Sequence, residues 1–149
     1  MTIPYANLPD PDRQAGFYAG VPFKRLVAFI VDLLVILIAA VLVSLLSLGL
    51  FFFVFLFVVT VVGFLYRVTT LANRSATWGM RLTGIELRRH DGEAFSFGDA
   101  VLHTAGFYLS VALAPVQFLS IILMLTTPRG QSLTDFFFGT VALNRMARA

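Results

Sequence analysis

RLVAFIVDLLVILIAAVLVSLLSLGLFFFVFLFVVTVVGFLYR, residues 25–67, contains a single charged residue, Asp32, between its terminal arginines. As one helix rising ~1.5 Å per residue, this stretch would be roughly 60 Å long, about twice the ~30 Å hydrocarbon core of a bilayer. Two serines and a glycine interrupt the apolar run between Ser44 and Gly49. The stretch therefore predicts two membrane-spanning helices, near residues 23–43 and 50–66, joined by a tight turn.

The composition of the whole chain agrees with a membrane protein. Its 149 residues are 58% hydrophobic and only 13% charged, against about 25% charged in a typical soluble domain. The absence of cysteine excludes disulfides and thiolate-bound metals, and two histidines offer little for a zinc site. Basic residues do not alternate with stacking aromatics as in nucleic-acid-binding segments. We expect one membrane domain that uses no metal or cofactor and binds no nucleic acid.

A second uncharged window, residues 100–128, predicts a third membrane segment near residues 101–125. Pro115 interrupts it and leaves two arrangements open. The segment is either one helix kinked at Pro115 or a re-entrant pair of half-helices that breaks at Ala114-Pro115. We therefore expect an all-α membrane protein with three transmembrane segments, divided into a flexible polar tail (1–22), a membrane domain (23–143) and a short C-terminal tail (144–149).

The distribution of basic residues predicts the orientation in the membrane. Arginine and lysine flank the N-terminal side of the first helix and follow the second helix, whereas the turn between the two has no charge. The positive-inside rule then places the N-terminus and the loop after the second helix in the cytoplasm, in a multi-pass inner-membrane protein. The C-terminal tail is also basic, with Arg129, Arg145 and Arg148, which favours the re-entrant arrangement.

The polar region 67–99 carries a small predicted substructure. Arg74, Trp78 and Arg81 are spaced as one helical face, which suits either the lipid headgroup region or a solvated loop. The alternation at 83–89, the Asp91-Gly92 turn and the alternation at 93–97 predict a cytoplasmic β-hairpin. Residues 139–143 also have the pattern of a strand. If they pair with 85–89, both segments lie on one side of the membrane.

Asp32 is the residue that most requires a function or a partner. An acidic residue at the centre of a membrane helix costs about 2.5–3.5 kcal/mol of insertion free energy. Arg25 lies two turns earlier, and Ala28 and Ala39 lie on the same face. Small residues allow a neighbouring helix to pack closely, so we expect Asp32 to face the helix bundle.

The third segment offers a matching polar seam, formed by His103, Ser110 and Gln117 at intervals of seven. A carboxylate, hydroxyl and amide oxygens and an imidazole could form a path for a cation or proton. The structural alternative is a set of hydrogen bonds that holds the helices together.

The C-terminal segment QSLTDFFFGT, residues 131–140, contains Asp135. Its simplest interpretation is a helix-cap or turn aspartate paired with Arg25 or Arg81. Elsewhere the sequence has no nucleotide-binding loop, metalloprotease motif or nucleophile elbow. We therefore expect that the protein is not an enzyme.

These residues, taken together, resemble the RDD family of small bacterial membrane proteins, which is named for one arginine and two aspartates. Arg25 opens the first apolar helix, Asp32 lies inside it and Asp135 ends a Gln-Ser-Leu-Thr-Asp segment. The segment TWGMRLTGIEL, residues 77–87, is similar to the family motif after the second helix, with Thr77, Gly79, Arg81 and Gly84 in place. Met80, Thr134 and Phe136 depart from the usual Lys, His and basic residue.

The resemblance implies a polytopic inner-membrane protein with a transport role, including sodium–proton exchange in some members. Our leading hypothesis is a homo-oligomeric transporter or cation/proton exchanger, in which Asp32 binds the ion, Arg25 tunes it and Asp135 completes the set. The rival hypothesis is a non-transporting membrane scaffold or assembly factor, with the same three residues as a structural polar clamp. An enzyme acting on lipid headgroups is a third, weaker alternative.

Overall fold

The computed structural model describes residue 5 and residues 7–145, so the ends of both predicted tails lie outside the description. It is mostly helical, and the expected class of an all-α membrane protein is confirmed. In chain order its elements are η1 (Ala15–Phe17), α1 (Val21–Leu46), η2 (Leu50–Val54), α2 (Phe55–Arg74), α3 (Trp78–Thr83), β1 (Ile85–Arg89), α4 (Phe97–Ala112), α5 (Ala114–Thr126), α6 (Leu133–Phe138) and β2 (Thr140–Asn144).

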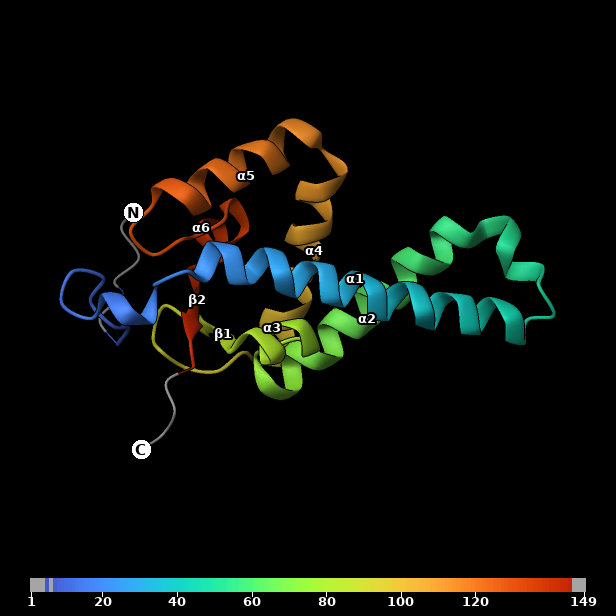
Figure 1. Ribbon diagram of the computed structural model, residues 1–149, viewed down its shortest axis with the longest axis horizontal. Coiled ribbons are helices and arrows are strands. Elements are labelled where there is room, and N and C mark those ends of the chain that lie inside the picture. The colour runs from blue at the N-terminus through green and yellow to red at the C-terminus, as the bar shows by residue number, and fades with distance from the viewer. Residues whose placement is uncertain (1–4, 6, 146–149) are drawn as a thin grey trace.

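Helices α1 and α2 form a long hairpin whose tip projects beyond the rest of the molecule (Figure 1). Both are long and apolar enough to cross a membrane. The turn falls at Ser47–Gly49, as predicted, and Gly49 has a φ of +84°, which glycine adopts without strain. The predicted bounds of the second helix were wrong. It begins at Phe55 after a 3-10 turn and continues to Arg74, which extends it past Tyr66.

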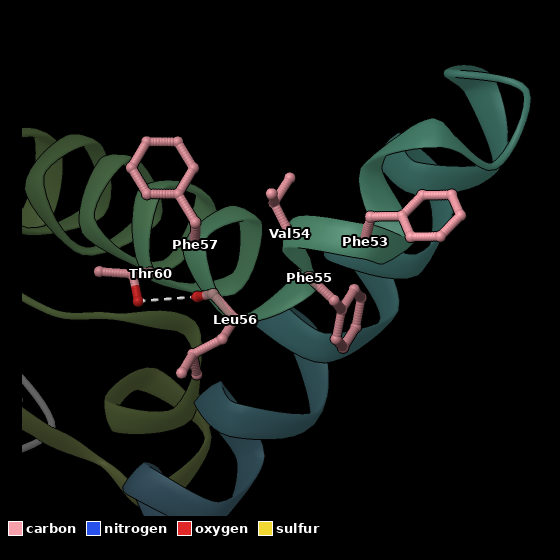
Figure 2. A pocket seen from close by; sticks show the side chains of 6 residues that line it. All are labelled: Phe53, Val54, Phe55, Leu56, Phe57 and Thr60. Atoms are coloured by element: carbon pink, nitrogen blue, oxygen red, sulfur yellow. Dashed lines mark hydrogen bonds between the residues drawn. The ribbon is translucent and has the colours of Figure 1, made fainter.

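The tip of the hairpin presents mostly apolar surface to its surroundings. Figure 2 shows the side chains of Phe53, Val54 and Phe57 pointing away from the backbone in different directions. The hydroxyl of Thr60 donates to the carbonyl oxygen of Leu56 on the preceding turn at 2.9 Å, and the hydroxyl of Ser47 in the turn donates to the carbonyl oxygen of Ser44 at 2.7 Å. A shallow hollow with these walls suits contact with lipid chains and offers no polar group for recognition.

The third window is a bent pair of helices. Helices α4 and α5 meet at an angle of 115°. Leu113 adopts an extended conformation between them, and Pro115 occupies the first turn of α5, where its missing N–H costs no hydrogen bond. The break at Leu113 lies next to Ala114-Pro115, close to where both arrangements placed the interruption.

A two-stranded antiparallel sheet ties distant parts of the chain together. Strand β1 pairs with β2 in a register that runs from Ile85↔Asn144 to Arg89↔Thr140. The predicted local hairpin with 93–97 was wrong, because Ser96 instead caps α4 in a reciprocal capping box with Asp99. The pairing with the tail segment, which the sequence also suggested, is the one that forms.

The sheet bears on the two arrangements of the third window. Because β2 pairs with β1, the chain after α5 returns to the end of the molecule where α2 led into α3 and β1. The N-terminal segment is at the same end, since the Asn144 side chain donates to the carbonyl oxygens of Gly16 and Ala19. A single kinked crossing would place these segments on opposite sides of a bilayer, so their pairing is the arrangement expected of the re-entrant alternative.

The region after α2 is not one continuous helical face. Ser75 has a φ of +54° and ends α2, and α3 starts afresh at Trp78. Arg74, Trp78 and Arg81 therefore do not share the face that their spacing predicted. The main apolar core is formed by the C-terminal part of α2, by α3 and by the sheet. It includes Val68, Leu71, Met80, Ile85 and Leu87.

Candidate functional site

Asp135 is the most completely bonded side chain of the site. It lies in the first turn of α6, where its carboxylate accepts from both the backbone N–H and the hydroxyl of Ser132 at 2.9 and 2.8 Å. The Thr140 hydroxyl and the Nε2–H of His103 donate to its other oxygen, each at 2.9 Å. The predicted helix-cap role of Asp135 is therefore what the structure shows.

Arg25 is the cationic partner of Asp135. Its guanidinium donates to Oδ2 of Asp135 at 2.6 Å and to the carbonyl oxygen of Gly130 at 3.3 Å. Burial raises the pKa of Asp135, but the positive charge of Arg25 and the hydrogen bond from His103 outweigh it and hold that pKa well below its usual range. The carboxylate is thus charged at neutral pH.

Asp32 is bound by a separate set of donors. It accepts from the Tyr66 hydroxyl at 2.7 Å, from the Thr77 hydroxyl at 2.6 Å and from the backbone N–H of Gly79 at 2.8 Å. It faces the bundle, as expected, but the predicted cluster of Arg25 with both aspartates was wrong. Within the described residues Arg25 pairs with Asp135 alone, because the carboxylate of Asp32 turns toward α2 and α3.

The motif after the second helix explains how α3 reaches Asp32. Thr77 caps α3 by accepting from the N–H of Met80, and its hydroxyl hydrogen remains for Asp32. A methyl group on Gly79 would overlap the carbonyl oxygen of Ala28, so only glycine lets α3 lie this close to α1. Gly84 ends α3 in the left-handed conformation, and Arg81 donates to the carbonyl oxygen of Ala76.

The predicted polar seam forms across the bend rather than along one helix. His103 and Ser110 are on α4, whereas Gln117 is on α5, and the Ser110 hydroxyl donates to the amide oxygen of Gln117 at 3.0 Å. This bond spans the Leu113 break and holds the two half-helices together.

A cavity of about 580 Å³ lies between α1 and the α4–α5 pair, and we call it the α1–α5 chamber. Most of its wall is apolar, with α6 closing one end. Its polar lining includes five of the six residues predicted for the ion site and the polar seam, together with one that was not predicted: Arg25, Asp32, His103, Ser110, Gln117 and the unpredicted Arg67. None of the four residues of the motif after the second helix (Thr77, Gly79, Arg81 and Gly84) lines it. Asp135 does not line the chamber but forms the ion pair with Arg25, which does.

Arg67 is the site residue that the sequence analysis missed. It is only 5% exposed, and its guanidinium lies over the ring of Phe107 at 4.0 Å. The predicted second helix ends at Tyr66, eight residues before the observed end at Arg74, and this placed Arg67 in the following loop. The signal was the buried face that continues through Gly63, Arg67 and Leu71 at intervals of four.

The described part of the chain contains no cluster of three histidine or carboxylate side chains that could hold a metal ion. What the site offers is a buried carboxyl group and a buried guanidinium that line one chamber, Asp32 and Arg67, with Arg25 paired to Asp135.

Comparison with known proteins identifies a family. The model of the RDD family matches residues 19–139, which covers most of the chain and includes Arg25, Asp32 and Asp135. No curated protein and no solved structure matches the sequence.

Proposed function

This chain belongs to the RDD family, and from that premise we propose that it is an ion-coupled transport protein whose binding site is the α1–α5 chamber. The observation that carries the proposal is the chamber itself. It places a buried aspartate and a buried arginine against a space large enough for a small solute, between helices built for a membrane. Ionisable groups at membrane depth are costly, and proteins that keep them use them in substrate or ion pathways.

Asp32 is the proposed binding group for a proton or a monovalent cation. Its carboxylate is accompanied by the hydroxyl oxygens of Tyr66 and Thr77 at 2.7 and 2.6 Å. A hydroxyl group can rotate its hydrogen away and offer a lone pair, so these three residues could supply several oxygen ligands to one small cation. Arg25 then acts through Asp135, by fixing α6 at the end of the chamber.

The proposal is tested by flux into liposomes that contain the purified protein. Under an imposed sodium, potassium or pH gradient, the wild type is expected to move protons or the cation, and Asp32→Asn is expected to abolish that flux. Tyr66→Phe, which keeps the ring but removes one oxygen, should reduce it. Glu93→Gln is the matched control, since Glu93 is an exposed carboxylate outside the chamber and should leave flux unchanged.

A second candidate function is favoured by one specific observation. Both aspartates are fully occupied by donors from their own chain, as in a structural polar clamp. A non-transporting scaffold or assembly factor of the inner membrane would need no more than this. A folded wild-type protein that moves neither protons nor any monovalent cation would favour this second function.

The proposal includes a location and an assembly. The N-terminal segment, β1 and β2 lie at one end of the molecule, and the basic residues there favour the cytoplasmic side of the inner membrane. Two spanning helices and one re-entrant pair enclose little space, so we propose a homo-oligomer as the working unit. The proposed role is binding and transport rather than catalysis.

A further inference from the structure

We infer that the α1–α5 chamber binds the acidic head group of a single-chain amphiphile, a carboxylate or phosphate monoester carrying an acyl chain, and that Arg67 anchors the head group. The inference rests on the proposed function only for the assignment of the chamber as the binding site. It adds the chemical class of the solute, which would accompany the ion bound at Asp32.

The first observation is that Arg67 is buried without an acceptor. Within the described residues, no hydrogen bond or ion pair is formed by its guanidinium, and its Nε–H is among the buried polar groups without a partner. The ring of Phe107 contacts one face of the guanidinium but cannot accept its in-plane N–H groups. A buried charge in this condition is costly, and an acceptor from a ligand would relieve the cost.

The other charges that line the chamber do not supply that acceptor. Arg25 is neutralised by Asp135 at 2.6 Å. Asp32 lies beyond the ion-pair distance from Arg67, and its oxygens already accept from Tyr66, Thr77 and Gly79. The group left over is a cation with five N–H donors, so the missing partner is an anion with several oxygens.

A guanidinium is specifically suited to carboxylate and phosphate head groups. Its planar fork of donors matches two oxygens at once, which favours these groups over a simple halide. A further donor lies in the same wall. The amide oxygen of Gln117 accepts from the Ser110 hydroxyl, and its NH₂ group remains to donate to an anionic head group. The guanidinium and this amide can together bind a compact anionic head.

The remaining wall of the chamber explains why an acyl chain should follow the head group. Phe23, Leu26 and Phe29 on α1 face Ile121, Met124 and Leu125 on α5 across the cavity. Several of these side chains are also exposed at its rim, including Phe23 at 70% and Leu125 at 69%. In a membrane this apolar rim meets lipid chains rather than water. A volume of about 580 Å³ is in the usual range for one small ligand, which suits a single chain.

The test is native mass spectrometry of the full-length protein in a neutral detergent, which counts bound molecules without requiring flux. The probes are oleate and lysophosphatidic acid, with a zwitterionic lysophosphatidylcholine, an uncharged monoacylglycerol and glycerol phosphate for comparison. We expect a one-to-one adduct with the two acidic amphiphiles. Arg67→Met should weaken it at least tenfold, and Arg67→Lys should retain part of it. Arg74→Met, an exposed arginine two turns further along α2, should bind as the wild type does.

A second variant tests the place of binding without altering Arg67. Val111→Trp fills the chamber wall from α4 and should remove the adduct from a protein that is still folded. Unchanged binding in Arg67→Met or Val111→Trp would overturn the inference. Equal binding of monoacylglycerol would mean that the chamber is an apolar groove that does not recognise charge. Equal binding of glycerol phosphate would mean that it is a site for free anions. Either result would overturn the inference that the ligand is an acidic amphiphile. Specific binding without cation or proton flux would support this inference and count against transport, whereas flux without binding would do the reverse.

Discussion

Arg25 and Asp135 form an ion pair at 2.6 Å although 110 positions separate them in the chain. The pair fastens the first turns of α1 to α6, and through the Thr140 hydroxyl it reaches the start of β2. Asp32, only two turns further along α1, contacts an entirely different group, formed by Tyr66 on α2 and the N-terminal end of α3. The two aspartates therefore hold positions two turns apart on α1 to different parts of the fold.

Removal of Arg25 should destabilise the protein through Asp135. Arg25→Ala leaves a buried carboxylate without its cation, which typically costs about 3–5 kcal/mol. Asp135→Asn should recover part of this loss in the double variant, because it removes the uncompensated charge. The measurement is the free energy of unfolding in detergent, with an expected coupling energy of about 0.5–3 kcal/mol.

The matched control for this cycle is Asp32→Asn combined with Arg25→Ala. Since Asp32 has its own donors, the effects of this second pair should be close to additive. Additive losses for Arg25 with Asp135, or strong coupling of Arg25 with Asp32, would contradict the observed pairing, in which Arg25 binds Asp135 and Asp32 has separate donors.

Acid should destabilise the protein through Asp135 in a defined direction. Burial raises the pKa of Asp135, but the combined effect of Arg25 and His103 is larger and lowers the folded-state pKa below the unfolded value of about 3.9. The folded state therefore gains stability from Asp135 that is complete above the unfolded pKa and is lost as the pH falls through the folded pKa. Between about pH 5 and 8 Asp135 should add no pH dependence to the thermal midpoint in detergent, because its contribution is complete there, and the midpoint should fall below about pH 4. Asp135→Asn should be less stable at neutral pH but lose less on acidification; an equal acid loss would refute the assignment.

The contact between α1 and α3 should depend on the lack of a side chain at Gly79. Gly79→Ala places a methyl group against the carbonyl oxygen of Ala28, and overpacking of this kind costs about 1–3 kcal/mol. It should also weaken the bond from the Gly79 N–H to Asp32. Gly98→Ala on α4 is the control, since its nearest neighbour is the Ser96 hydroxyl at 3.8 Å from the added carbon. A Gly79→Ala protein with the unfolding midpoint of the wild type would show that α3 does not pack this closely.

Local signals in the sequence were enough for the α1–α2 hairpin and for the helix-cap role of Asp135. The near absence of charged residues between Arg25 and Arg67 indicates the membrane helices, and Gly49 indicates their turn. The return of the chain through α4 and α5 could be foreseen as an alternative, because the basic tail conflicted with a third full crossing. These features depend on neighbours in sequence or on the bilayer, and both can be read from one chain.

The features that the sequence did not determine all depend on contacts between distant segments. The alternation at 93–97 suits a strand, yet Ser96 forms a better helix cap and β1 takes its partner from the tail. Arg25 and Asp32 share a helical face by spacing, but the side-chain direction of each follows the element packed beside it. Arg67 was overlooked because an arginine after an apolar run normally marks the end of a membrane helix, whereas α2 continues beyond it.

The re-entrant path of α4 and α5 predicts which loops share a side of the membrane. The chain has no native cysteine, so single cysteines at Leu48, Ala94 and Arg145 can be labelled without background in intact and opened cells. Leu48 is 99% exposed at the tip of the α1–α2 hairpin, whereas Ala94 and Arg145 both adjoin the β1–β2 sheet. A membrane-impermeant maleimide should therefore label Leu48→Cys from outside intact cells, and the other two only after the cells are opened. Arg13→Cys should follow Ala94→Cys, because the Asn144 side chain binds the neighbouring N-terminal segment. Labelling of Arg145→Cys from outside while Ala94→Cys stays protected would require α4 and α5 to cross the membrane once, and the β1–β2 pairing would then be impossible.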